Sequence, residues 1–163
     1  MKKVLVPYAA YNLWAHQQML QRLKELPDEV LRTKVPNSFE SIFNTVQHLL
    51  DAESMWWQRM KLLENVKRPS DGFSGDFSEL SKEVLQQATL WQQWVSEAQD
   101  RAFDHEFIYY NTKKEKFKQP IYEMLLHVFN HSTYHRGQLV TILHQLKINN
   151  IPNTDFIAWS RKK

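Results

Sequence analysis

Three histidines recur every four residues in the last third of the chain: His127, His131 and His135. In an α-helix, residues four apart lie on nearly one face and are about 6 Å apart along the axis. Two neighbouring members of this set can therefore converge on one metal ion. His127 and His135 are about 12 Å apart and seldom bind the same ion. The spacing predicts a helix that contributes two imidazole ligands.

A useful metal site needs a third ligand from a facing helix. His48 is the only histidine near the middle of the second predicted helix, where it can face the pair across the core. Three neutral imidazoles and a water form an open, catalytic type of site, in which the pKa of the bound water falls to about 7. Zinc, nickel, copper, iron and cobalt all accept imidazole, so the sequence does not name the metal.

The alternative is that these histidines are ordinary helix residues, one of them partly buried and the others solvated. Two other metal chemistries are excluded, because the chain has neither the His-Glu-x-x-His of zinc proteases nor the Glu-x-x-His of di-iron bundles. It also has no cysteine, hence no disulfide and no nucleophilic thiol of its own. Thiol chemistry in this protein must use a thiol from outside.

Long helices are expected to position these residues, because apolar side chains recur at helical spacing in four stretches. The stretches run from about Tyr8 to Leu26, Asn37 to Leu63, Asp76 to Arg101 and Pro120 to Lys147. The second and third begin with the spacing of a capping box, Asn37 with Glu40 and Asp76 with Glu79. We therefore expect an all-α fold, a four-helix bundle around one core.

The connections are read from their composition. Residues 67 to 75 are rich in Pro, Gly and Ser and are predicted to form a loop. Residues 107 to 117 have β-prone side chains on one side of a polar turn, which suggests a short hairpin or extended loop before the last long helix. The tail carries Phe156 and Trp159 and is expected to pack back on the bundle. Residues 1–163 are read as a single domain.

Composition limits the classes of partner. The formal net charge is +3 and the lysines are scattered apart from a group between 113 and 118, too small an excess to indicate nucleic-acid binding. No window approaches 18 apolar residues, and the start of the chain lacks the features of a secretory leader. We expect a cytoplasmic protein that does not insert into a membrane.

Two residues that follow His135 have more than one interpretation. Arg136 can pair with a carboxylate of the second helix, Glu53 or Asp51, or it can be solvated. Gly137 lies inside a predicted helix, where glycine costs about 1 kcal/mol relative to alanine. It marks either a close helix contact or ligand approach beside His135, or a merely tolerated glycine.

Three segments, HVFNHSTYHRGQ at 127–138, YNLWAH at 11–16 and QHLLDAE at 47–53, resemble the DinB/YfiT-like family, as does the tail IPNTDFIAW. The resemblance covers almost the whole chain. It implies a four-helix bundle with an uncommon connection order, frequent homodimers, and a metal bound by one histidine of the second helix and two of the fourth. These map onto His48, His131 and His135, and the usual ligand set leaves out His127.

The sequence departs from the commoner family pattern at His16, where many relatives look like Asn, and at Tyr134, where another His often stands. Neither departure touches the expected ligands. His127 is expected to pack beside them or to support them. Pocket-lining aromatics such as Trp14, Trp56 or Trp57 would set substrate specificity, although helical spacing makes each more often a core residue.

The resemblance implies more than one possible activity, because the family has different kinds of member. Some family members are metal-dependent thiol transferases that use a low-molecular-weight thiol such as bacillithiol or mycothiol, and others are only called damage-inducible proteins. We expect a divalent metal, zinc, nickel or similar, and a thiol S-transferase acting on a small molecule. The alternatives are a metal-dependent hydrolase and a non-enzymatic metal-binding protein of the stress response.

Overall fold

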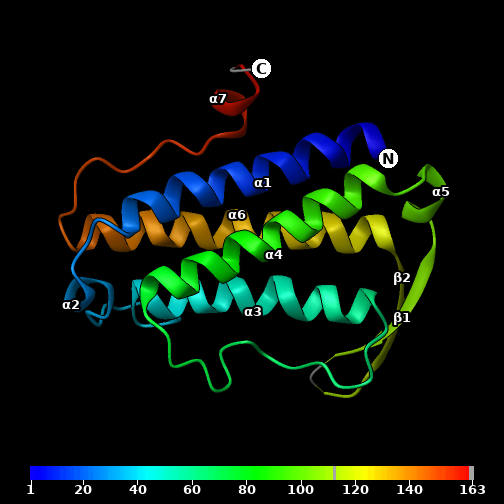
Figure 1. Ribbon diagram of the computed structural model, residues 1–163, viewed down its shortest axis with the longest axis horizontal. Helices are drawn as coiled ribbons and strands as arrows, with labels where there is room; N and C mark the ends of the chain where they lie inside the picture. Colours follow the sequence, from blue (N-terminus) through cyan, green and yellow to red (C-terminus); the bar gives the residue numbers. More distant parts are fainter. Residues whose placement is uncertain (112, 162–163) are drawn as a thin grey trace.

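The computed structural model describes residues 1–111 and 113–161 and consists mainly of four long helices (Figure 1). These helices are α1 (Lys2–Leu23), α3 (Ile42–Met60), α4 (Phe77–Glu97) and α6 (Ile121–Gln145). Helix α1 packs against α4 and α6, and α3 packs against the same two helices. The fold is the expected helical bundle, in which the consecutive helices α1 and α3 lie at opposite corners.

The directions of the helices explain the long connection after α3. Figure 1 shows α1 and α6 running one way and α3 and α4 running the other. Because α3 and α4 are parallel neighbours, residues 61–76 must return along the length of α3 before α4 begins. This is the uncommon connection order that the family resemblance implied. It leaves α3 beside α6, the helix that carries the histidine series.

Two predicted helix starts differ from the structure. Helix α3 begins after Ser41, whose Oγ accepts a hydrogen bond from the Asn44 N–H at 3.1 Å. Asn37 instead accepts from the Phe39 N–H within a loop, and Glu40 has a φ of 62°, which ends that loop before the helix. Helix α1 already starts at Lys2 and continues through Pro7, which lies near enough to its start to remove only one intrahelical bond.

Five short elements complete the described part of the chain. The predicted hairpin is confirmed as β1 (Glu106–Tyr110) paired antiparallel with β2 (Lys116–Pro120). Three short helices were not predicted, because four or five residues are too few for a periodic signal. They are α2 (Asp28–Leu31), α5 (Asp100–Phe103) and α7 (Phe156–Ser160).

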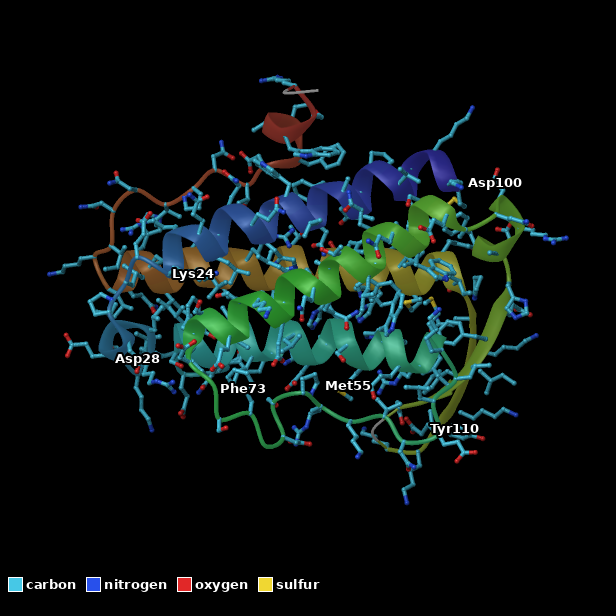
Figure 2. The ribbon with its side chains drawn as sticks, viewed as in Figure 1. Lys24, Asp28, Met55, Phe73, Asp100 and Tyr110 are labelled. Atoms are coloured by element: carbon cyan, nitrogen blue, oxygen red, sulfur yellow. The ribbon has the colours of Figure 1, made fainter. Side chains whose placement is uncertain are left out.

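The tail packs back on the bundle as expected. Trp159 of α7 is buried and its ring lies 5.9 Å from that of Tyr11, whose hydroxyl donates to the Thr154 carbonyl at 2.8 Å. Within the bundle, apolar side chains fill the space between the helices (Figure 2). Among the residues that the structure describes, no helix combines the length and apolar character needed to cross a bilayer.

The capping box of α4 gives a test of local stability. Asp76 accepts from the Glu79 N–H at 2.8 Å, and the Glu79 carboxylate accepts from the Asp76 N–H at 2.9 Å. Replacing Asp76 by Ala should lower the free energy of unfolding by about 1 kcal/mol, because one N–H of the first turn loses its acceptor. Urea unfolding followed by circular dichroism measures this. Ser78→Ala, an exposed change in the same turn, should be nearly neutral, and equal losses in both variants would contradict the cap.

Candidate metal centre

His48 of α3 meets His131 and His135 of α6 at the interface between the two helices. The Nε2 atom of His131 lies 3.4 Å from that of His48 and 3.0 Å from that of His135. All three residues offer a ligand nitrogen within 4.8 Å of the others. The structure therefore brings together the three histidines singled out from the sequence, and they could hold a metal ion.

The spacing of these nitrogens fits a shared ion. Imidazole nitrogens bind zinc at about 2.1 Å, which places two ligands of a tetrahedral ion about 3.4 Å apart and adjacent ligands of an octahedral ion about 3.0 Å apart. The two nitrogen separations in the structure, 3.4 and 3.0 Å, lie within the range that these two geometries span. Neutral imidazoles are also the donors that zinc, nickel and similar ions accept.

The orientation of His135 is fixed by a neighbour one turn along α6. Its Nδ1 lies 2.7 Å from the Oε1 atom of Gln138. A carbonyl oxygen only accepts hydrogen bonds, so Nδ1 carries the proton and Nε2 presents its lone pair to the centre. Such a partner fixes the tautomer of a metal-binding histidine and its ring orientation. Gln138 was not identified from the sequence, although it belongs to the His-Arg-Gly-Gln run.

The charge state of the triad follows from burial and crowding. Burial, and then the neighbouring His135, lower the pKa of His48 to about 4. Burial, followed by the other three clustered histidines, lowers the pKa of His131 to about 4. Burial also lowers the pKa of His135. All three rings are therefore neutral at pH 7, the form in which imidazole binds a metal.

An aromatic ring from a loop covers one side of the centre. Phe39 stacks on His48 with ring centroids 4.1 Å apart, and its centroid lies 5.5 Å from that of His135 in an edge-to-face arrangement. The sequence pattern placed Phe39 inside a helix, because Asn37 and Glu40 match a capping box. The real cap, Ser41, has no such partner and gives a weaker signal. The loop conformation therefore supplies a wall that periodicity could not predict.

His127 lies outside the triad. Its ring centroid is 5.6 Å from that of His131 and 5.2 Å from that of Trp56 on α3. Burial, and then the positive charge of Arg59, lower the pKa of His127. The expectation that His127 packs beside the ligands agrees with these contacts. Tyr134 lies on the open side of α6, 62% exposed, with its ring 5.0 Å from that of His135.

A buried polar network lies behind the triad and joins three helices. The Oε1 atom of Glu53, a residue 2% exposed, accepts from Asn12 at 2.9 Å, His16 at 2.8 Å and Ser132 at 2.7 Å. Despite the opposing effect of burial, these contacts hold the pKa of Glu53 below its usual value. Burial lowers the pKa of His16, so a neutral imidazole donates to an ionised carboxylate. The departure at His16 thus supplies a donor to Glu53.

Both interpretations of Arg136 drawn from the sequence are wrong. It is neither solvated nor paired with Glu53 or Asp51, but is 2% exposed and donates to Asn12 at 2.8 Å and to Thr133 at 2.9 Å. Asn12 lies between the guanidinium and the carboxylate and bonds to both.

The structure also shows the surroundings of Asp51 and Gly137. Asp51 is occupied elsewhere, since its carboxylate accepts from the backbone N–H and hydroxyl of Ser70. A Cβ at Gly137 would meet no atom within 4 Å, which excludes a close helix contact there and agrees with a tolerated glycine.

The pKa shifts predict how acid affects the metal-free protein. The folded rings of His48 and His131 titrate near 4, whereas unfolded imidazoles titrate near 6.5. Between these values the unfolded state binds more protons, so stability should be fully present above pH 6.5 and fall toward pH 4. Urea midpoints of the metal-free protein at several pH values measure this. The double variant His48→Ala, His131→Ala should lose less over the same interval; an unchanged pH dependence would contradict the assignment.

The Glu53 network gives a second test. In Glu53→Gln a neutral amide replaces the ion that three donors share, so the free energy of unfolding should fall by about 3 kcal/mol. Chemical denaturation of the metal-free protein measures the change. Glu64→Gln, in the exposed segment after α3, is the matched control and should change stability by less than about 0.5 kcal/mol. A Glu53→Gln variant as stable as this control would argue against the network.

Comparison with known proteins agrees with the fold. The model of the DinB family matches residues 1–157. The chain is 28% identical over 162 residues to Protein DinB of Bacillus subtilis (strain 168), in an alignment covering 90% of this chain and 87% of the relative. The crystal structure of a DinB-like protein from Bacillus cereus ATCC 10987 superposes with a TM-score of 0.68 at 17% identity, covering 88% of this chain and 91% of that one. The chain belongs to the DinB family.

Proposed function

We propose that His48, His131 and His135 bind a divalent transition metal, zinc, nickel or similar, and that the chain is a metal-dependent thiol S-transferase using an external low-molecular-weight thiol. The observation that carries this proposal is the triad itself: three convergent imidazoles, with no fourth protein ligand in the described cluster. A bound metal would favour the thiolate form of a cosubstrate at neutral pH. The absence of cysteine from the chain supports an external thiol.

The residues around the triad suit this role. Three neutral ligands leave the charge of a divalent ion uncompensated, which favours an anionic sulfur as a further ligand. Gln138 holds the ring of His135, and Phe39 covers the side of the triad next to His48. In the transfer, the thiol loses its proton, its sulfur forms a bond to the electrophilic atom, and the leaving group departs with the bonding electrons.

A metal-dependent hydrolase ranks second because it needs a general base near the triad. The two nearest carboxylates on α3 are both engaged. Glu53 accepts three hydrogen bonds through one oxygen, and Asp51 accepts two from Ser70. Asp51 is therefore not a free base, and Glu53, although its Oε2 atom has no hydrogen-bond partner, is buried and 2% exposed. A non-enzymatic metal-binding role in the stress response would favour a closed coordination shell instead of a triad in which two of the histidines are partly exposed.

The remaining expectations are kept as parts of the proposal. We propose that the chain acts in the cytoplasm as a single domain, forms a homodimer, and binds small molecules and not nucleic acid. The small net charge of +3 supports the last point. Exposed apolar side chains on α6 and α7 support self-association, and they are Tyr134, Phe156 and Ile157. Light scattering at several concentrations tests the dimer.

The first test of the triad is metal content. Tag-free protein, reconstituted and desalted, should carry about one metal per chain by plasma mass spectrometry, because three preorganised imidazoles bind tightly. His131→Ala should lose tight binding and keep its helical circular dichroism, because the apolar core lies elsewhere. His144→Ala, an exposed change on the same helix, should keep the metal. Equal metal content in both variants would contradict the site.

The second test addresses the thiol. In cobalt-loaded protein, an added low-molecular-weight thiol should produce a sulfur-to-cobalt charge-transfer band, and the band should be absent from His131→Ala. Transfer of the thiol to a chromogenic electrophile then measures activity. Stoichiometric metal without a thiol band or transfer would overturn the transferase proposal, and hydrolysis of activated esters would identify the second candidate.

A further inference from the structure

Arg59 of α3 is a partly buried cation without an acidic partner. Its guanidinium carbon lies 4.8 Å from the ring centroid of Trp56 and 5.9 Å from that of Tyr109 on β1. None of the ion pairs among residues 1–111 and 113–161 includes Arg59, and its buried Nε atom has no hydrogen-bond partner. A guanidinium that lies beside two aromatic rings, with one donor that no side chain accepts from, is suited to bind a planar oxyanion.

A pocket opens beside this guanidinium. It has a volume of about 270 Å³ and lies between the end of α3, the segment that follows it, and β1. Its apolar lining includes Leu62, Val66 and Ile108, together with the ring of Tyr109. Leu62, Ile108 and other lining side chains are exposed, so the pocket is open to solvent and a dissolved anion can enter it. The lining also includes the acidic side chain of Glu64.

A row of rings connects Arg59 to the triad. The ring centroid of His131 lies 5.6 Å from that of His127, and the centroid of His127 lies 5.2 Å from that of Trp56. Trp56 is the ring that the guanidinium of Arg59 contacts. Each step is close to one helical turn, so the guanidinium is roughly 10–15 Å from the triad. Figure 2 labels Met55 on this stretch of α3 and Tyr110 at the end of β1, beyond the helix.

The small side chain of Ala52 lies one turn after His48 and one turn before Trp56 on the same helix. Its methyl group projects less from the helix than the rings on either side of it. A molecule long enough to reach from the triad to Arg59 would lie over this stretch of α3 and the rings of His127 and Trp56.

We propose that Arg59 binds the carboxylate of the small molecule that reacts at the triad. This inference rests on the proposed function for the reaction, and it adds the substrate class: an organic acid with a body long enough to extend from the triad to the end of α3. The carboxylate belongs either to the thiol cosubstrate or to the electrophile. Both sources share the same chemistry at Arg59, a planar oxyanion received by a planar guanidinium.

The direct test uses metal-free protein and ligands without a thiol. Octanoate should quench or shift tryptophan fluorescence with saturation, because it binds against Trp56, and octanol should bind at least tenfold more weakly. Arg59→Gln should reduce octanoate affinity about tenfold or more and leave octanol unchanged. Equal octanoate affinity in Arg59→Gln and the unmodified protein would overturn the proposal.

Two further variants separate charge recognition from packing. Lys61→Gln removes an exposed cation that lies over Trp57 two residues along the chain, and octanoate binding should be unaffected. Arg59→Lys keeps the charge without the planar fork and should retain more affinity than Arg59→Gln. If Lys61→Gln weakened octanoate as much as Arg59→Gln does, general surface charge would explain the binding and the proposal would fail.

Binding of mercapto acids of increasing length identifies which reactant carries the carboxylate, the thiol or the electrophile. On metal-loaded protein, mercaptooctanoate should bind more tightly than mercaptooctanol, and mercaptopropionate no more tightly than its alcohol, if the thiol carries the carboxylate. If length gives no gain while octanoate still requires Arg59, the electrophile carries it. Metal content is measured separately, so a chain that binds metal but not octanoate refutes only this inference. A chain that binds octanoate but no metal refutes the proposed function.

Discussion

One carboxylate oxygen in the middle of the bundle sets the relation between three helices. Glu53 Oε1 on α3 receives hydrogen bonds from Asn12 and His16 on α1 and from Ser132 on α6. Losing these three donors would leave a buried charge without any partner, so α3 and α6 cannot slide past each other without a large cost. Ser132 directly follows His131. The network therefore fixes the register of the helix pair that supplies the triad.

The histidine triad was predictable because its signal is local. A four-residue repeat within α6 and one histidine in the middle of α3 are visible in the sequence, and the bundle places them at one interface. The Asp76 capping box and the hairpin were predictable for the same reason, since each depends on neighbours within a few residues. The family resemblance implied only an uncommon connection order, and periodicity did not predict which helices pack against each other.

The remaining parts of the site depend on contacts between distant segments. Arg136 looks like an ordinary surface cation in the sequence, and only the packing of α1 against α6 shows that Asn12 separates it from Glu53. Phe39 fits a helical stripe, yet the backbone at Glu40 takes a positive φ and directs the preceding loop onto His48. Polar networks and loop walls lack a sequence period, so periodicity does not predict them.

The order of the helices along the chain also determines when the site can exist. His48 and His131 are separated by 83 residues, and α4 and the hairpin are made between them. Closing a loop of this length precedes any contact between the two rings. During synthesis, a chain that ends before α6 carries a single imidazole of the three and has no competent site. The three imidazoles therefore come together only after the last long helix has joined the bundle, and a metal bound there would act on a fold that has already formed.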